Sequence, residues 1–424
     1  MLDIRFIREN PDLIREAARK KGVQFDISKL LKTDESRKRL LGEVEALRSR
    51  INKTSDEIAL MSNENERSAS IEKMREVKTL LAKMEEELKT VDYDFKSLML
   101  DVPNIPDPSV PEGKSDADNV EVRRWGNARV FDLKAKDHLT IMKELDLVDI
   151  ERGAKVSGMR GYFLKGDVVV LSFALWKFAV DHLVKKGFEL FGAPAIVKGE
   201  HLIGTGHFPQ TKDDVYSLGD NHYLSATAEI SMMGYHTGEI FDEVELPKKY
   251  VAFSPCYRRE AGSYGKDTKG IYRVHEFYKV EQLMLVKNDH QESVRWHEEL
   301  TKNAEELMQM LNIPYRVVVN CGGDIGRAHV KTYDIESWIP SENRYRETHS
   351  SSYYHDFQTR RFNIRYRGED GKIQFTHSLN NTVIATPRIL IAILENNQQP
   401  DGSVVVPEAL RSFVGKDVFR KPSS

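Results

Sequence analysis

The chain has 424 residues, of which 40% are hydrophobic and 30% charged, and a formal net charge of −3. This length allows one large core or a core domain with a smaller one, and the charge excludes a uniformly basic nucleic-acid-binding protein. There is no apolar run long enough for a membrane span and no signal peptide at 1–10, so we expect a cytoplasmic protein without a membrane segment. Cys256 and Cys321 lack a CxxC pattern, which predicts free thiols rather than a zinc site.

The first hundred residues have the pattern of a helical hairpin. Between Lys29 and Leu100 there is one glycine and no proline. Apolar residues recur at steps of three and four in two stripes, Leu40, Val44, Leu47, Ile51, Ile58 and Met61, and then Ile71, Met74, Leu81, Leu88, Val91 and Phe95. Such narrow stripes are typical of a coiled-coil seam, and the polar segment 62–68 predicts a turn between two antiparallel helices. A coil through which two chains dimerise would show the same pattern.

A proline-rich segment, 102–111, follows the hairpin, and we place the boundary between two domains there, at 1–105 and 106–424. In the second domain we predict helices at 172–186, 291–311 and 389–397. Strands are predicted at 188–197, with an interruption at Pro194, and at 250–256, 280–286, 315–319 and 331–338. Regular βαβ units are few, so this order predicts an α+β fold with a mostly antiparallel sheet flanked by helices.

Residues 253–281 read as a strand, a loop with Gly262, Gly265 and Gly270, and a return strand. Arg258 and Glu260 are two residues apart, so on a strand they would share one face. Phe277 and Glu281 are four residues apart, so they would also share a face. An arginine there can hold a phosphate or a carboxylate with two hydrogen bonds. An aromatic surface beside two acids and an arginine suits a nucleotide together with an amino acid. A surface hairpin with paired charges would also explain an isolated R-x-E sequence.

Two later segments also suit a phosphate ligand. Pro387 fits a helix start, which places Arg388 in the first turn, where a cation is unfavourable unless an anion binds nearby. Glu347 lies close to hydroxyl side chains at 348 and 350–352, a set of hard oxygen ligands that suits Mg²⁺ carrying phosphates. Neither GxGxxG nor GxxxxGK[ST] occurs, so a nucleotide would need another kind of phosphate site. Taken singly, each segment also fits an ordinary polar loop.

Preceded by Ala226-Thr227-Ala228-Glu229, these segments in this order resemble seryl-tRNA synthetases over essentially the whole chain. Residues 1–11 and the hairpin resemble that family's N-terminus and tRNA-binding arm. The stretch around Pro194 resembles class II motif 1, which forms the dimer interface, and 258–281 and 380–388 resemble motifs 2 and 3. The resemblance implies a homodimeric serine–tRNA ligase with an antiparallel class II catalytic fold. Its substrates would be L-serine, ATP and tRNA(Ser), with selenocysteine tRNA as a further acceptor and Mg²⁺ as cofactor.

The resemblance also implies the roles of single residues. Arg258 and Arg388 would be the catalytic pair, on the α- and γ-phosphates at opposite ends of one ATP. Phe277 would stack on adenine, with Glu260 at its edge, and the metal ligands would be Glu347 and Ser350. The remaining ATP-binding positions would be Arg259, Val274, Thr348 and His349. The serine pocket would be formed by Thr227, Ala228, Glu229, Arg258, Glu281, Asn380 and Thr382. The pair Thr348-His349 departs from the one expected between Glu347 and Ser350 in many relatives.

Two other functions stay open at this stage. Synthetase-like paralogues load amino acids onto carrier proteins, but they lack a long N-terminal arm. A non-catalytic homologue could act as an RNA-binding module, and it would be expected to have lost some of the residues with implied catalytic roles. Those positions still hold Arg258, Glu260, Glu281, Glu347 and Arg388.

Overall fold

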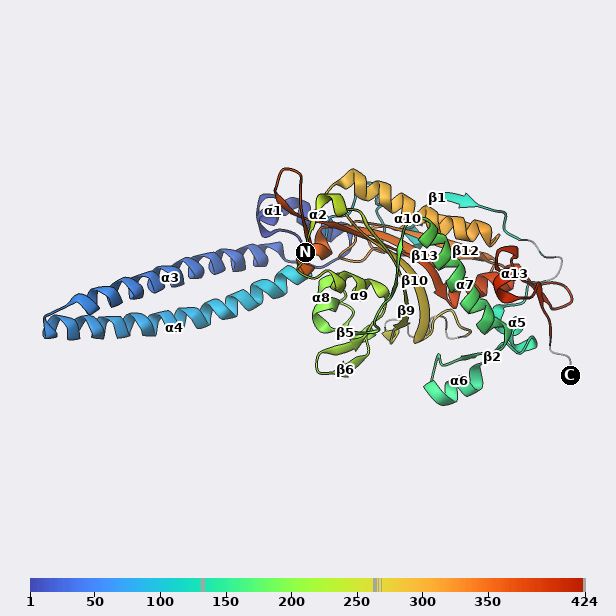
Figure 1. Ribbon diagram of the computed structural model, residues 1–424, viewed down its shortest axis with the longest axis horizontal. Coiled ribbons are helices and arrows are strands. Elements are labelled where there is room, and N and C mark those ends of the chain that lie inside the picture. Colours follow the sequence, from blue (N-terminus) through green and yellow to red (C-terminus); the bar gives the residue numbers. More distant parts are fainter. Residues whose placement is uncertain (130, 132–133, 262–264, 266, 268, 422–424) are drawn as a thin grey trace. The chain divides into compact units, whose positions relative to one another are not determined.

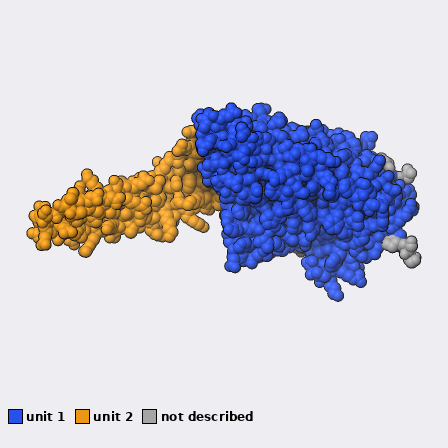
Figure 2. All heavy atoms as spheres, viewed as in Figure 1, with its two compact units in different colours: residues 1, 20–22, 104–424 blue, residues 2–19, 23–103 orange. Residues whose placement is uncertain are grey.

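The computed structural model describes residues 1–129, 131, 134–261, 265, 267 and 269–421, and Gly262 of the predicted loop lies outside these ranges. The chain divides into two compact units, one of residues 2–19 with 23–103 and one of residue 1 with 20–22 and 104–424 (Figure 2). The segment 23–103 is therefore flanked on both sides by residues of the larger unit. Cys256 and Cys321 are both buried and free, as predicted. Among the described helices, none has the length and apolar character of a membrane span.

The smaller unit is a helical hairpin. Two short helices, α1 (Ile4–Glu9) and α2 (Pro11–Lys20), precede the long helices α3 (Ile27–Leu60) and α4 (Glu64–Asp101), which pack side by side (Figure 1). Leu40 and Val44 of the predicted seam are each 1% exposed. The pairing is thus within one chain, as we expected for a hairpin. The turn is shorter than predicted, because the side chain of Asn63 accepts hydrogen bonds from the N–H groups of Asn65 and Glu66 and caps α4 there.

The larger unit is built on an eight-stranded sheet with the order β1-β11-β12-β13-β16-β10-β9-β4. Its strands are β1 (Val120–Trp125), β4 (Glu189–Gly192), β9 (Lys248–Tyr257), β10 (Glu276–Val286), β11 (Tyr315–Val319), β12 (Lys331–Ile339), β13 (Arg344–His355) and β16 (His377–Thr386). Every neighbouring pair is antiparallel except β4 with β9. This confirms the predicted α+β fold.

The predicted strand 188–197 is divided between two sheets. Its first part is β4, whereas β5 (Ile196–Lys198) pairs with β7 (His222–Leu224) in a small sheet completed by β6 (Ser217–Gly219). The remaining strands are β2 (Val148–Asp149), β3 (Phe163–Leu164), β8 (Ile240–Asp242), β14 (Arg365–Arg367), β15 (Ile373–Phe375), β17 (Val404–Val405) and β18 (Val418–Phe419). The break around Pro194 therefore ends one strand instead of only bending it.

Helices cover the main sheet. The helices α7 (Asp167–Lys185), α10 (His290–Met310) and α12 (Arg388–Asn396) share one apolar core with Val280 and Met284 of β10. Helix α9 (Ala228–Tyr235) packs with Ala252 and Leu283, which alternate with the residues that face α10. The other helices are α5 (His138–Glu144), α6 (Ile150–Ser157), α8 (Gly199–Thr205), α11 (Phe357–Phe362) and α13 (Glu408–Val414). All three predicted helices are present, and α7 begins five residues earlier than expected, at Asp167.

Two β-bulges decide which residues point away from the apolar core. The pairing of β12 with β13 shifts so that Ile335 opposes His349 but Glu336 opposes Glu347. Residues three apart on a regular strand lie on opposite faces. Thr348 is the extra residue of this bulge, and it brings Glu347 and Ser350 onto the same face. A second shift, where β10 pairs with β16, does the same for Thr382 and Ala385. Both bulges thus turn residues three apart in the sequence toward one side of the sheet, where all four line the same cavity.

Candidate active site

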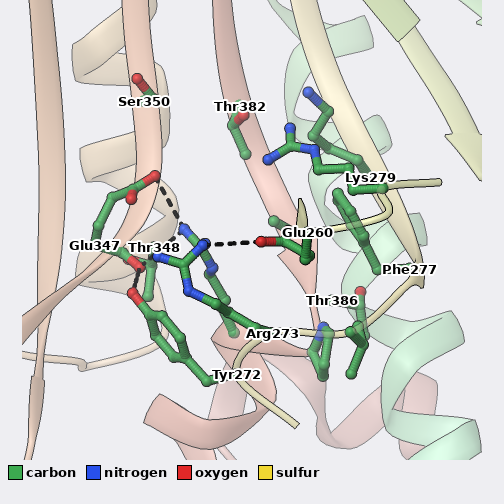
Figure 3. Close-up of a pocket in the computed structure, with 15 residues that line it drawn as sticks. Glu260, Tyr272, Arg273, Phe277, Lys279, Glu347, Thr348, Ser350, Thr382 and Thr386 are labelled. Atoms are coloured by element: carbon green, nitrogen blue, oxygen red, sulfur yellow. Dashed lines mark hydrogen bonds and ion pairs between the residues drawn. The ribbon is translucent and has the colours of Figure 1, made fainter. Parts of the chain in front are cut away.

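Two adjoining cavities lie on the face of the sheet that carries Lys279. Cavity A, of about 250 Å³, is lined by strands β10, β13 and β16 and by the first residue of α12 (Figure 3). Cavity B, of about 330 Å³, is lined by β10, β13 and β16 and by the start of α9. The residues common to both linings are Arg258, Lys279, Ser350 and Thr382. A ligand in one cavity can therefore meet a ligand in the other beside these four side chains.

Cavity A contains most of the predicted ATP-site residues. Its lining includes Arg258, Glu260, Val274, Phe277, Glu347, Thr348, Ser350 and Arg388. Two of these, Arg258 and Arg388, come from segments far apart in the sequence. Its basic side chains, Arg258, Arg273, Lys279 and Arg388, number four against two carboxylates, Glu260 and Glu347. The cavity is therefore suited to a polyanion.

The expected strand geometry of Arg258 and Glu260 is wrong. Strand β9 ends at Tyr257, and Glu260 has φ +55°, so the alternation of side chains along a strand does not apply to them. Arg258 is held instead by its backbone, which exchanges hydrogen bonds of 2.9 Å with the carbonyl oxygen and the ring Nδ1 of His275. Its guanidinium lies 5.3 Å from the ring centre of Phe277, while Glu260 forms an ion pair of 3.1 Å with Arg273 (Figure 3). The loop nevertheless brings both side chains into cavity A.

Arg388 begins α12, as predicted, and its guanidinium meets a carboxylate instead of solvent. Its Nη1 lies 3.0 Å from Oε1 of Glu347, and the guanidinium lies 4.6 Å from the ring centre of Tyr272. Burial alone would raise the pKa of Glu347, but the nearby Arg388 and Arg258 outweigh burial and lower it. The two arginines therefore favour the ionised form of Glu347, and this carboxylate compensates for a cation placed at a helix N-terminus.

The surroundings of Glu347 and Ser350 suit a metal ion that keeps other oxygen ligands. Among the described residues there is no group of three or more His, Cys, Asp or Glu side chains that could hold a metal by themselves. Mg²⁺ typically takes one or two carboxylates and completes its shell with water and phosphate oxygens. Glu347 and Ser350 fit that partial shell. Asp334, which pairs with Ser350 across the sheet, was missed by the sequence reasoning, and burial raises its pKa well above the usual value.

Cavity B holds a compact buried network. The hydroxyl of Thr227, the N-cap of α9, donates to Oε2 of Glu281 at 2.5 Å and accepts a hydrogen bond of 2.7 Å from Nζ of Lys279. Lys279 also forms an ion pair of 2.8 Å with Glu281. Lys279 was not predicted, although it stands between Phe277 and Glu281 in the same two-residue alternation. The polar side chains of this network line cavity B together with Asn380 and Thr382.

The carboxyl group of Glu229 lies buried in cavity B and has a raised pKa. It is 7% exposed and accepts a hydrogen bond of 2.5 Å from Nε2 of Gln358. Burial and the neighbouring carboxylate of Glu281 raise the pKa of Glu229 from 4.5 to about 7. In the folded protein this side chain therefore holds its proton over a pH range in which the unfolded chain has lost it.

This shift predicts a pH-dependent penalty on stability. The folded state binds more protons than the unfolded state between the two pKa values, so the free energy of unfolding falls as the pH rises through this window. At about 1.4 kcal/mol per pKa unit, the wild type should lose about 3 kcal/mol relative to Glu229→Gln between about pH 4 and about pH 8. Urea unfolding of both proteins at several pH values measures this difference. A difference that does not change with pH would contradict the raised pKa.

Three predicted site residues line neither cavity. Ala228 packs into a small apolar cluster with Met232, and Arg259 is exposed with its backbone N–H bonded to the carbonyl oxygen of Asp214 at 2.8 Å. His349 is 1% exposed, and burial lowers its pKa to about 4. Residues that the sequence reasoning missed are Tyr272, Arg273, Lys279, His207 and the loop Gly326–His329. These lie in irregular segments or between predicted positions, where sequence patterns give little signal.

Comparisons with known proteins identify the family of the chain. Residues 1–106 match the family described as seryl-tRNA synthetase N-terminal domain, and residues 212–397 match the class II tRNA synthetase core domain (G, H, P, S and T). The chain is 46% identical to a serine–tRNA ligase of Deinococcus radiodurans, with 100% of both chains covered. It is 43% identical to one of Thermodesulfovibrio yellowstonii, with 99% of this chain and 100% of the relative covered.

Solved structures give the same result. The seryl-tRNA synthetase of Pyrococcus horikoshii complexed with ATP superposes with a TM-score of 0.91 at 39% identity, over 100% of both chains. The cytoplasmic serine–tRNA ligase of Naegleria fowleri in complex with AMP gives a TM-score of 0.87 at 35% identity, covering 100% of this chain and 99% of the other. A Giardia lamblia prolyl-tRNA synthetase, at 14% identity and a TM-score of 0.56, shares the fold alone.

Proposed function

This chain belongs to the seryl-tRNA synthetase family and is a serine-specific aminoacyl-tRNA ligase, and we propose that its two cavities divide the substrates of the first reaction step. Cavity A takes ATP and cavity B takes L-serine. The observation that carries this proposal is the convergence of Arg258 and Arg388 in one cationic cavity that adjoins a second cavity with a buried Glu281. The ATP and AMP complexes of the two solved relatives support it.

In the first step, a carboxylate oxygen of serine attacks the α-phosphorus of ATP. A carboxyl O–P bond forms, the bond from the α-phosphorus to the bridging oxygen breaks, and pyrophosphate leaves with its electron pair. No protein nucleophile is needed, so the residues must align the reactants and neutralise the growing phosphate charge. Arg258 lines both cavities, which suits a guanidinium on the α-phosphate at the point where the substrates meet. Arg388, which lines cavity A alone, suits the γ-phosphate.

The other residues of cavity A are assigned to the adenine base and to the metal-bound phosphates. Phe277, stacked near Arg258, offers its ring to adenine, and Glu260 and Val274 lie along the edge of the base. Thr348 lies beside Glu347 and Ser350 in the same cavity. A Mg²⁺ held by Glu347 and Ser350 would neutralise phosphate charge when bound. The ion pair of Glu347 with Arg388 keeps both side chains directed into cavity A before the nucleotide arrives.

Selection of serine requires a test for its hydroxyl, because alanine and glycine are smaller and enter any pocket that serine enters. A site built to bond a hydroxyl can reject an analogue without one by roughly 10⁴-fold, since its own polar groups would stay unpaired. Glu281, Thr382 and Asn380 are our candidates for these groups. Thr227 and Glu229 complete the pocket, and a bound serine ammonium group would favour the ionised form of Glu229 and pair with it.

We assign residues 1–105 to tRNA binding and 106–424 to catalysis. In the second step, a terminal ribose hydroxyl of tRNA(Ser) attacks the carbonyl carbon of the adenylate and AMP leaves, and selenocysteine tRNA is a further acceptor. The helical hairpin resembles an arm for RNA, and it carries basic residues on exposed positions such as Arg75 and Lys78. The enzyme works in the cytoplasm as a homodimer.

The homodimer proposal is supported by an apolar surface around the segment that resembles motif 1. Helix α7 exposes Phe173 at 62% and Val184 at 46%, and the edge strand β4 exposes Leu190 at 50%. Helix α7 and strand β4 are neighbours, and large apolar side chains exposed on neighbouring elements are typical of a protein interface. Edge strands such as β4 also tend to be covered in stable proteins.

Phe173→Asp should therefore convert a dimer into a monomer, because it replaces the most exposed of these apolar side chains by a charge at the proposed interface. Sedimentation velocity at micromolar concentration measures the change. The control is Arg124→Asp on β1, at the opposite edge of the sheet from β4, which alters an exposed charge away from α7 and should leave the dimer intact. A monomeric wild type, or a Phe173→Asp variant that stays dimeric, would count against this interface.

Two assays separate the three candidate functions. Serine-dependent pyrophosphate–ATP exchange and charging of tRNA(Ser) should both occur, and exchange should stop on chelation with EDTA and return with Mg²⁺. Exchange with glycine or alanine but no charging would favour a carrier-protein ligase. Binding of RNA with no exchange for any amino acid would favour a non-catalytic homologue. Charging of selenocysteine tRNA is tested in the same way.

A further inference from the structure

The loop Gly326–His329 lines cavity B, and two residues hold its backbone. Lys21 donates from Nζ to the carbonyl oxygens of Gly326, Arg327 and His329, at 3.2, 2.9 and 2.6 Å. Asn104 donates its backbone N–H to the carbonyl oxygen of Arg327 at 2.8 Å and its side-chain Nδ2 to that of Ala328 at 2.9 Å. Every carbonyl group of this irregular four-residue loop is thus bonded to Lys21 or Asn104.

Both of these residues are buried, which makes the arrangement costly. Lys21 is 5% exposed and Asn104 is 2% exposed. Burial lowers the pKa of the Lys21 ammonium well below its usual value, and the three carbonyl oxygens match its three N–H donors. A buried ammonium that faces only backbone carbonyls adds little net stability. Its effect is to fix the direction of the loop, and with it one wall of cavity B.

The position of these residues in the sequence gives their hydrogen bonds a second role. Lys21 lies in the short segment 20–22 and Asn104 begins the segment 104–424, so together they flank the residues 23–103 that carry the long helical hairpin. The segments at the two ends of the hairpin therefore both donate hydrogen bonds to the same loop. The loop lines cavity B but not cavity A. A displacement of either connection would reach the proposed serine pocket and would leave the nucleotide cavity unchanged.

We propose that Lys21 and Asn104 are positioning residues that couple the hairpin to cavity B: they hold the loop Gly326–His329 for serine and transmit the engagement of tRNA to serine binding. The inference rests on the proposed assignment of cavity B to serine and of the hairpin to tRNA. Coupling between two binding sites is reciprocal, so occupied cavity B must raise the affinity for tRNA by the same factor.

The positioning role predicts a selective change in KM. In tRNA-free pyrophosphate exchange, Lys21→Met and Asn104→Ala should each raise the KM for serine about tenfold and leave the KM for ATP within about twofold. Lys21→Gln, which keeps two N–H donors, should restore part of the affinity for serine. The matched control is Lys20→Met, which removes a neighbouring ammonium and should leave both KM values unchanged. An equal rise of both KM values would mean general damage to the fold and would overturn the proposal.

The coupling itself is measured by tRNA binding. The Kd for tRNA(Ser) is determined with and without a non-hydrolysable seryl-adenylate analogue. The ratio of the Kd without the analogue to the Kd with it should be at least about five for the wild type and for Lys20→Met. It should fall to about one in Lys21→Met and Asn104→Ala, with thermal unfolding showing that both are folded. Should Lys21→Met fail to fold, Lys21→Gln and Asn104→Ala decide the result. A wild type without serine-dependent exchange would refute the proposed function, whereas an active enzyme whose variants keep the wild-type ratio would refute only this inference.

Discussion

Arg258→Ala and Arg388→Ala should each lower kcat/KM for serine-dependent pyrophosphate exchange by about 10³-fold or more. Charge develops on the α-phosphate and on the leaving pyrophosphate, and a guanidinium held in place in a protein cavity stabilises this charge more than water does. Because Arg258 lines both cavities, its removal should act mainly on kcat. The removal of Arg388, which lines cavity A alone, should also raise the KM for ATP.

The control for these variants is Arg124→Ala, which removes an exposed arginine from the edge strand β1. It should change kcat/KM by less than about twofold. Arg388→Ala also leaves Glu347 without its ion-pair partner, so Arg388→Lys is included to retain a positive charge without the paired N–H donors. If kcat/KM fell by less than about tenfold in either alanine variant, the arginine would not contact a phosphate in the transition state, because such a contact typically contributes more.

The sequence allowed the architecture to be predicted where patterns are local. The strand 315–319 matches β11 residue for residue, because a short run of β-branched residues between turns has few alternatives. Arg388 was placed in the first turn of a helix from Pro387 alone, and α12 begins there. The hairpin turn was misplaced because polar residues after Asn63 suit both a loop and the first turn of a capped helix.

The candidate site was less predictable, because it depends on register. Glu347 and Ser350 share a face only through the bulge at Thr348, and no local pattern marks that extra residue. The expectation that Arg258 and Glu260 share the face of a strand assumed that β9 continued to Glu260, whereas it ends at Tyr257. Lys279 could have been found, since it alternates with Phe277 and Glu281, but a buried lysine is rare, and the alternation alone does not predict one.

Deletion of residues 30–97 should spare adenylate formation and abolish charging of tRNA. The exchange rate should stay within about threefold of the wild type, because both cavities are formed by residues of 104–424 and because Lys21 and Asn104 are retained. Charging should fall by at least about 10³-fold, since contacts to the RNA backbone supply much of the affinity for tRNA. Exchange is followed with labelled pyrophosphate and charging with labelled serine. An equal decrease of both activities would show that the hairpin is part of the catalytic structure.

A milder variant tests the same role without removing a unit. Arg75→Glu with Lys78→Glu reverses two charges one helical turn apart on exposed positions of α4. If the hairpin meets phosphates, these changes should weaken tRNA binding and flatten its dependence on salt by up to about one unit of slope for each phosphate that is no longer neutralised. The KM for serine without tRNA should not change, because neither residue lines cavity B. The deletion and the charge reversal thus separate two roles of the N-terminal residues: the hairpin supplies affinity for RNA, while the residues that flank it set the serine pocket.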